Sequence, residues 1–278
     1  MDIAPYSADI AITEFLTAHA PITRQQCDEY AASVTGEAVT PVDVQGSFSY
    51  TLAAGDDQII QFRAADSDLN RAILDLARQI HHQVVPLFFA ASWEGRQHLS
   101  VDVINATHDD YRLRFELLSR SLPPRFQENL SRVRQGLPLL FSGSYHMTLS
   151  HGDLNGLNVF VDPNTGHITG IIDWPEATIG PFGMSLWGLE SFLGFMDAKG
   201  WHYYPNCDQL RDLFWQTFEF ATGELSPEEK EVIQIARMAG LFLQYGFAWE
   251  KGGREPADVG SMSFLYLDAF CAGSSALS

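Results

Sequence analysis

Two aspartates and an asparagine stand at spacings that suit phosphoryl transfer. Asp153 and Asn158 are five residues apart in a polar loop, and Asp173 follows the next apolar run. In such chemistry one carboxylate takes the proton of the acceptor hydroxyl, while an amide and a second carboxylate hold Mg²⁺ on the phosphates. The three side chains therefore predict a phosphoryl-transfer site, provided that the fold brings them together.

The sequence between them indicates how they meet. Two β-type runs, 159–161 and 168–172, flank the turn sequence Asp-Pro-Asn-Thr-Gly at 162–166, which predicts a hairpin. The hairpin would carry all three polar side chains at one end. The plainer alternative is that Asp and Asn stand at hairpin ends as turn formers. The sequence His-Gly-Asp starting at His151 and the Ile-Asp-Trp sequence at 172–174 favour the catalytic interpretation.

These motifs resemble those of the aminoglycoside phosphotransferase/choline kinase family, most closely its fungal phosphotransferase-like branch. Members carry H-G-D-x-x-x-x-N, found here at 151–158, and I-D-W or I-D-F, found here at 172–174. The resemblance implies an α+β, two-lobed protein-kinase-like fold, with a small antiparallel-sheet N-lobe and a mainly helical C-lobe that carries a catalytic hairpin. It also implies ATP or GTP with Mg²⁺ as cofactors and a hydroxyl-bearing small molecule as substrate. Activity does not follow from the fold and has to be argued from the site.

Each residue of the motif has an expected role. Asp153 is expected to be the general base, while His151 is expected to shape the loop through backbone hydrogen bonds rather than perform chemistry. Asn158 and Asp173 are expected to hold Mg²⁺, which neutralises charge on the transferred group. Glu176 is interpreted as a surface turn residue, with contact to a cationic substrate as the alternative.

The segment before residue 105 is expected to bind the nucleotide. Two strand-like runs, 42–52 and 58–63, flank a turn at 54–57. Gly46 and Ser47, within the first run, match the phosphate-covering loop of kinase-like folds, although one glycine gives a poor cradle of amides and a plain turn is the alternative.

Arg63 ends the second strand-like run, where relatives usually carry a Lys that binds phosphates. Arginine can chelate phosphate oxygens, but its planar fork is not equivalent to an ammonium group. The alternative is a solvated cation at a strand end. The helix predicted over 67–82 contains no glutamate to orient this cation, so Asp68 or Asp75 would have to serve.

A third strand is predicted over 99–104, and the polar segment 105–110 behind it is interpreted as the lobe boundary. The backbone of Ile104 would then contact the purine edge. This divides the chain into an N-lobe, 1–105, on the nucleotide side and a C-lobe, 106–278, on the substrate side.

The C-lobe is predicted to be helical outside the hairpin. Two helices are expected over 111–139 with a break at 122–124, and a capping box at 226–229 opens a helix that runs toward Gly246. Ser185 stands where relatives place an Asp that braces the His-Gly-Asp loop, and a hydroxyl cannot repeat that charged contact.

The amino-acid composition limits the classes of partner that the protein is expected to bind. The 278 residues are 46% hydrophobic, and 17 basic against 35 acidic residues give a net charge of −18. This charge argues against nucleic acid or an anionic membrane as partner; it favours solubility, with attraction of a cationic substrate as the alternative. Three widely spaced cysteines, no visible signal peptide and no apolar span predict a cytoplasmic protein with reduced thiols.

Two classes of function remain open. The first is an ATP/Mg²⁺-dependent O-phosphotransferase acting on a small molecule, favoured by the intact set of Asp153, Asn158 and Asp173. The second is a degenerate relative that binds a small molecule or performs nucleotide-independent acid–base chemistry. Arg63, the single glycine, the missing helix glutamate and Ser185 favour the second class.

Overall fold

The computed structural model describes residues 6–46, 49–55, 58–63, 71–80, 101–174, 176–197, 199–250 and 253–273. By their contacts, the residues divide into two compact units, Met1–Asn70 and Arg71–Ser278. The predicted lobe boundary at residue 105 stays a prediction, because residues 81–100 lie outside the described part of the chain.

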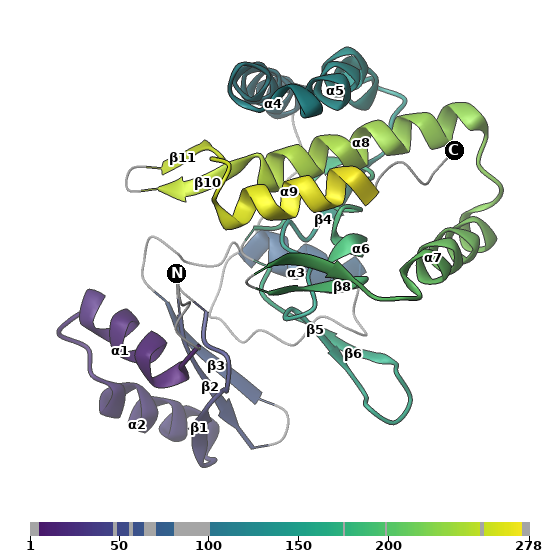
Figure 1. The fold of residues 1–278 in the computed structure, drawn as a ribbon. Coiled ribbons are helices and arrows are strands. Elements are labelled where there is room, and N and C mark those ends of the chain that lie inside the picture. Colours follow the sequence, from purple (N-terminus) through teal and green to yellow (C-terminus); the bar gives the residue numbers. More distant parts are fainter. Residues whose placement is uncertain are drawn as a thin grey trace. The chain divides into compact units, whose positions relative to one another are not determined.

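The first unit combines two helices with a small antiparallel sheet (Figure 1). Helices α1 (Ala8–Ala18) and α2 (Arg24–Thr35) precede strands β1 (Val39–Pro41), β2 (Ser49–Ala54) and β3 (Gln58–Arg63), which pair in the order β1-β2-β3. Both pairings are antiparallel. The antiparallel N-terminal sheet of the predicted α+β class is therefore confirmed.

Local signals set the ends of α2. The Thr23 side chain accepts a hydrogen bond from the Gln26 amide, and the Thr23 amide donates one to the Gln26 side-chain oxygen. Gly36 ends the helix with φ of 74°, a left-handed conformation that glycine adopts at low cost. Apolar residues of both helices pack on β2 in one core, formed by Ile12, Phe15, Cys27, Ala31, Tyr50 and Leu52.

The predicted strand over 42–52 is wrong in its first half, because residues 42–46 form no strand. The Gln45 side chain holds this segment instead: its amide nitrogen donates to the carbonyls of Val42 and Thr51, and its amide oxygen accepts from the Thr51 amide. Gln45 is buried, so these bonds replace a strand ladder.

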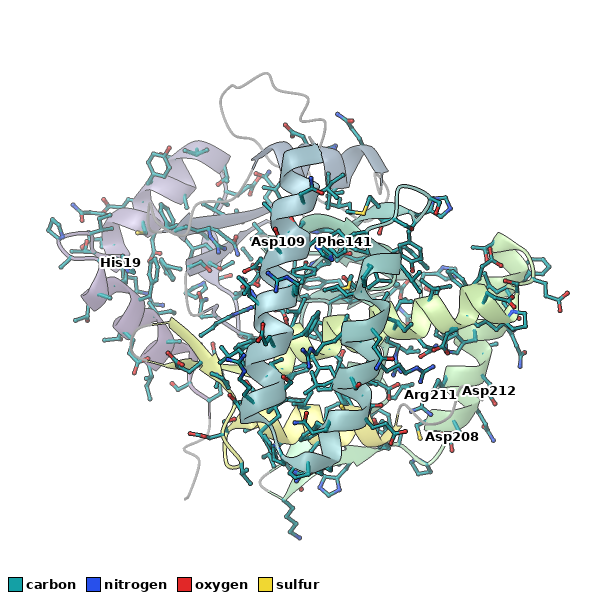
Figure 2. All side chains as sticks on the ribbon, turned by 90° about the horizontal axis from the view of Figure 1, so that it is seen from above. His19, Asp109, Phe141, Asp208, Arg211 and Asp212 are labelled. Atoms are coloured by element: carbon teal, nitrogen blue, oxygen red, sulfur yellow. The ribbon has the colours of Figure 1, made fainter. Side chains whose placement is uncertain are left out.

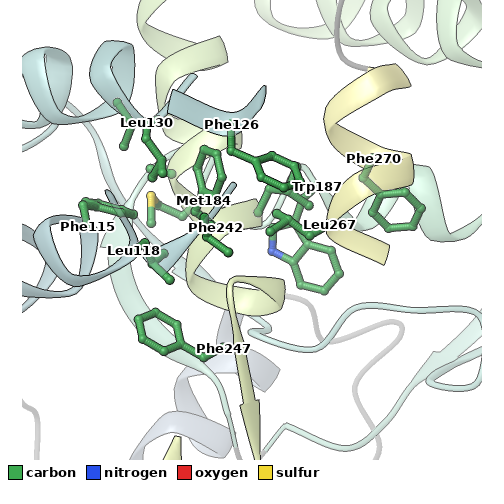
Figure 3. Close-up of a cluster of buried hydrophobic side chains, with 14 of the residues drawn as sticks. Phe115, Leu118, Phe126, Leu130, Met184, Trp187, Phe242, Phe247, Leu267 and Phe270 are labelled. Atoms are coloured by element: carbon green, nitrogen blue, oxygen red, sulfur yellow. The ribbon is translucent and has the colours of Figure 1, made fainter. Parts of the chain in front are cut away.

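Four long helices build the core of the second unit (Figure 1). They are α4 (Val101–Ser121), α5 (Gln127–Leu140), α8 (Pro227–Tyr245) and α9 (Met262–Gly273). Aromatic and aliphatic side chains from all four meet in one cluster, which Figure 3 shows with Phe115, Leu130, Phe242, Leu267 and Phe270 among its members. Helix α3 (Arg71–Ile80) covers the described part of the helix predicted over 67–82.

The strand predicted over 99–104 is wrong where the chain is described, and the polar segment 105–110 behind it is helical. From Val101 onward these residues belong to α4, so Ile104 is helical and supplies no extended hinge backbone. Apolar side chains at helical spacing, including Phe115 and Leu118, are fully buried. The preference of Val and Ile for strands is weak, and the packing of these buried side chains stabilises the helix more. Once a helix has formed, adding further residues to it costs little free energy.

The other helical predictions here hold. The chain breaks after Ser121 into the 3₁₀ turn Pro124–Phe126 before α5. Ser226 and Glu229 form the predicted capping box, and α8 then runs to its C-cap at Gly246.

Strands of the second unit form short antiparallel pairs. Strand β4 (Met147–Ser150) pairs with β7 (Thr178–Pro181), and β5 (Val159–Val161) pairs with β6 (Ile168–Ile171). The second pair is the predicted hairpin, so the mainly helical C-lobe with its hairpin is confirmed.

The rest of the C-lobe is not wholly helical, contrary to prediction. The helix expected beyond Ser185 is only one turn, α6 (Gly188–Ser191), and the hairpin β8 (Gly194–Asp197) with β9 (Gly200–Tyr203) follows. Gly200 has φ of 123°, which suits a tight turn and not a helix. Helix α7 is present at Cys207–Thr222, while a further hairpin follows α8, formed by β10 (Phe247–Glu250) and β11 (Gly253–Pro256).

Among the described helices, none combines the length and the apolar character that crossing a membrane would require.

Candidate active site

The hairpin brings Asn158 and Asp173 to the same end, as the sequence predicts. Val159 faces Ile171 in the register of β5 and β6, and beyond the strands the Ile172 amide donates to the Asn158 carbonyl at 3.0 Å. Asn158 thus accepts this hydrogen bond, and Asp173 directly follows the residue that donates it. The spacing of the motif is explained by the hairpin geometry.

Asp153 belongs to the same cluster. The side-chain nitrogen of Asn158 donates to the Asp153 carbonyl at 2.7 Å and to its carboxylate at 3.2 Å. The side-chain nitrogen of Asn155 donates to the other carboxylate oxygen at 3.2 Å. The loop 153–158 therefore folds back so that two amides hold one carboxylate.

Burial raises the pKa of the Asp153 carboxyl above its ordinary value. The hydrogen bond from Asn155 lowers that pKa, the charge of Asp173 raises it, and the hydrogen bond from Asn158 lowers it again, so burial decides the direction. A carboxylate with a raised pKa is a better proton acceptor than an ordinary surface aspartate, which suits a general base.

His151 is buried and has a structural role. Its Nε2–H donates to the Ile172 carbonyl at 2.8 Å, because a carbonyl can only accept, and its Nδ1 accepts from the Asp153 amide at 3.3 Å. Its ring lies 4.6 Å from that of Trp174. Burial lowers the pKa of His151, so the imidazole is neutral near pH 7. Both nitrogens are engaged, so His151 ties the loop to the hairpin.

Two residues of the site have a positive φ, which most residue types avoid. Gly152 has φ of 84°, and a Cβ atom there would overlap the Glu176 carbonyl. Among the described non-glycine residues, Asp173 has the one positive φ, 63°. Aspartate and asparagine are the residues that tolerate this region best. Glycine at 152 and Asp at 173 are therefore set by the backbone as well as by chemistry.

The nucleotide-side candidates belong to the first unit or lie outside the site. Gly46 is exposed and follows Gln45, whose side chain holds the segment 42–46, and Ser47 lies outside the described residues. Arg63 ends β3 opposite Ser49, and its guanidinium donates weakly to Gln61 at 3.4 Å. Ile104 is part of α4. Within the second unit the structure brings together the four motif residues, and the roles of the other candidates stay predictions.

Asn155 and Trp174 are site residues that sequence reasoning missed. Asn155 donates to Asp153 and also accepts from the Leu157 amide at 2.9 Å. Trp174 is buried against His151, and its indole N–H donates to the Ile171 carbonyl at 2.9 Å. The usable signal for Asn155 was its place two residues after Asp153, because Asn readily bonds to nearby backbone in loops.

The donor set at the hairpin end suits Mg²⁺. Asn158 turns its side-chain nitrogen toward Asp153, so its side-chain oxygen is the atom that could ligate a metal. The charge of Asp173 acts on the same carboxylate, Asp153. Mg²⁺ is commonly held by one or two carboxylates together with substrate phosphates and waters. Among the described residues, no group of three or more His, Cys, Asp or Glu forms a metal cage. A pair of side-chain oxygens completed by phosphates and waters would suit this ion.

Comparison with known proteins identifies the family. The model of the phosphotransferase enzyme family matches residues 41–219, which is well over half of the chain and includes every motif residue. The chain belongs to this family. The family predicted from the motifs is therefore confirmed, while the fungal branch stays a prediction. A search of curated proteins gives no significant match.

Several solved structures are similar in fold. Choline kinase LicA from Streptococcus pneumoniae has a TM-score of 0.45 at 14% identity, covering 90% of this chain and 98% of that one. Spectinomycin phosphotransferase in complex with ADP and spectinomycin has 0.44 at 15%, covering 81% and 88%. Macrolide 2'-phosphotransferase type I has 0.41 at 13%, covering 80% and 91%. These scores mark a partial likeness, from which no substrate follows.

Proposed function

We propose that the protein is a Mg²⁺-dependent O-phosphotransferase that uses ATP or GTP to phosphorylate a hydroxyl of a small molecule. The observation that carries the proposal is the Asp153 carboxylate, held by two asparagine amides at one end of the hairpin, with its pKa raised by burial. Family membership supports the same reaction class. The charge of −18 supports a small-molecule partner and not nucleic acid or an anionic membrane, and the free cysteines suit a cytoplasmic setting.

In the proposed reaction the hydroxyl oxygen of the acceptor forms a bond to the γ-phosphorus. The bond from that phosphorus to the bridging oxygen breaks, and the nucleoside diphosphate leaves with the electron pair. Asp153 takes the hydroxyl proton, and Asn155 and Asn158 hold its carboxylate in place. Asn158 and Asp173 would hold Mg²⁺, which when bound neutralises charge on the phosphates. His151 keeps the loop against the hairpin.

The second candidate is a degenerate family member that performs nucleotide-independent acid–base chemistry in the same site or only binds a small molecule. Two observations favour it. Arg63 stands in place of the usual Lys, and within the described residues the Ser185 side chain makes no hydrogen bond to the catalytic loop.

Arg63 discriminates between these two functions. If it binds the α- and β-phosphates, Arg63→Ala should lower turnover on the order of 10²-fold or more, because this chemistry depends on preorganised charge. Arg63→Lys should keep part of the activity, since the charge remains. The measurement is phosphate release from Mg–ATP or Mg–GTP with water as acceptor, then product formation with a panel of hydroxyl-bearing small molecules. Arg24→Ala, in the same unit but exposed, is the control.

A degenerate relative would behave differently. Arg63→Ala would then change stability by about 0.5 kcal/mol or less, as for a surface residue, and leave activity unchanged. Turnover of an acceptor in nucleotide-free buffer, undiminished in both Arg63 variants, would refute the phosphotransferase.

Asp173→Asn tests the metal site. Asparagine tolerates the left-handed backbone at this position, so the substitution removes the charge and keeps the conformation. We expect the affinity for ATP in the presence of Mg²⁺ to fall by at least about tenfold, the lower end for a disturbed metal site, and the metal-free affinity to stay the same. Titration calorimetry with and without Mg²⁺ measures both.

Asp162→Asn is the matched control for this experiment, because Asp162 lies in the turn at the far end of the same hairpin. If wild type and Asp173→Asn both bind ATP equally well with and without Mg²⁺, the metal assignment is wrong.

A further inference from the structure

The catalytic loop has a second neighbour besides the hairpin. Gly188, the first residue of α6, lies against the backbone of Leu154, which is next to Asp153. A Cβ atom at Gly188 would be 2.7 Å from the Leu154 carbonyl oxygen and 3.6 Å from the Leu154 Cβ. Because a carbonyl of the backbone cannot turn aside as a side-chain end can, any residue other than glycine would displace the loop or α6.

Helix α6 is in turn fixed by a buried carboxylate. Glu190 is fully buried, and its two oxygens accept hydrogen bonds from three side chains. Arg211 of α7 donates to both oxygens at 3.2 and 2.9 Å, Arg237 of α8 donates to one at 2.5 Å, and the Tyr203 hydroxyl donates to the other at 3.0 Å. Arg211 lies beside Asp208, its second partner, on α7 (Figure 2).

The segment before α6 also packs against α8 at close range. A Cβ at Gly240 would overlap the Met184 carbonyl, and a Cβ at Gly183 would come within 3.0 Å of the Ala236 Cβ. Met184 and Trp187 are part of the helical core (Figure 3). Residues 183–190 are therefore anchored to α8 by backbone packing at one end and by the Glu190 ion pair at the other.

We propose that α6 positions the catalytic loop, with Gly188 setting its distance from Leu154 and the buried Glu190 cluster holding α6 in place. Glu190 and Gly188 are positioning residues, since neither touches a reacting atom. The loop has one close backbone contact just before Asp153 in the chain, where Gly152 lies against Glu176. It has another just after Asp153, where Leu154 lies against Gly188. In the described part of the chain, this packing supports the loop where the Ser185 side chain makes no hydrogen bond to it. As a role in catalysis, this rests on the proposed function.

Gly188→Ala is the direct test, read by hydrogen exchange of individual amides. The amides of Asp153, Leu157 and Asn158 are hydrogen-bonded within the loop. They should exchange about tenfold faster in the variant, as expected when a local opening becomes easier, while amides in the middle of α5 keep their wild-type rates. Gly180→Ala is the matched control, because a Cβ there meets nothing within 4 Å; its loop rates should equal those of wild type.

Tyr203→Phe is the milder second variant. It removes the hydroxyl that donates to Glu190 at 3.0 Å and to the Ala269 carbonyl at 3.4 Å. Both arginines stay in place, so the fold should be retained. Loop amides should then exchange about two- to fivefold faster, in keeping with the loss of one hydroxyl at a distance. Unchanged loop rates in Gly188→Ala, or loop and α5 rates that rise together in both variants, would overturn the proposal.

Turnover gives an independent readout. With Mg–ATP and water as acceptor, Gly188→Ala should lower kcat by about 10- to 100-fold, since small misplacements of a reacting group are costly, and change KM for the nucleotide by less than about twofold. A raised KM with unchanged kcat would overturn the positioning role. Wild-type protein without any turnover would instead contradict the proposed function, and the exchange rates would still decide whether α6 positions the loop.

Discussion

Asp153→Asn should lower phosphoryl transfer about 10³-fold, within the range that a positioned general base contributes. The substitution keeps the size of the side chain and removes its ability to take the acceptor's proton. Asn158 still donates to the residue-153 carbonyl, so the loop keeps its main tie to the hairpin. The rate of acceptor phosphorylation measures the loss, and thermal unfolding measures whether the fold is kept.

The pH dependence gives the same residue a second signature. A general base works when it is deprotonated, so wild-type turnover should be lost as pH falls through the pKa of Asp153. Burial raises that pKa, so the loss should begin at higher pH than for an ordinary aspartate. The residual activity of Asp153→Asn should lack this acid limb. The control Asp162→Asn should keep both the wild-type rate and the loss of activity at low pH. Turnover of Asp153→Asn within about threefold of wild type would exclude the role of Asp153 as general base.

The parts of the site that sequence reasoning predicted correctly are those determined by local signals. The hairpin follows from two apolar runs and a turn sequence, and its register alone places Asn158 beside Asp173. The capping box of α8 is equally local, since Ser226 and Glu229 are three residues apart. In both cases the residues that decide the structure are neighbours in the chain.

Other features of the structure depend on contacts between residues that are far apart in the sequence. Val101–Ile104 favours a strand by residue type, yet burial of Phe115 and Leu118 against the other helices makes it the first turn of α4. Glu190 bonds to Arg211 and Arg237, 21 and 47 residues away, and nothing in the sequence pairs them.

The glycines of the site show the same limit. Gly152 is visible in the His-Gly-Asp motif, but the carbonyl of Glu176 that forbids a side chain there is not. Gly188 stands in no motif, and its approach to Leu154 becomes visible only in the folded chain. Sequence reasoning could therefore name candidate site residues but not the contacts that hold them.

Glu190→Ala should destabilise the protein by about 3–5 kcal/mol, the cost of removing one member of a buried ion pair. Arg211 and Arg237 are both nearly buried, at 5% and 3% exposure, and Glu190 is the carboxylate that they share. Burial lowers the pKa of Arg237, and the charge of Glu190 raises it, so removing the carboxylate leaves the arginine in an environment that opposes its charge. Urea unfolding measures the loss of unfolding free energy, provided that wild type and variant show the same dependence of that free energy on urea concentration.

Two further variants separate the cost of losing the carboxylate from the contribution of the whole ion cluster. Glu231→Ala breaks an ion pair with Arg132 in which both side chains are about half exposed, and such a pair should contribute no more than about 1 kcal/mol. Replacing Glu190, Arg211 and Arg237 together by Leu, Met and Met should cost less than Glu190→Ala alone, because the buried positive charges are then removed together with the carboxylate. A Glu190→Ala loss no greater than that of Glu231→Ala would show that water reaches both arginines. The cluster could not then hold α6 rigidly against α7 and α8.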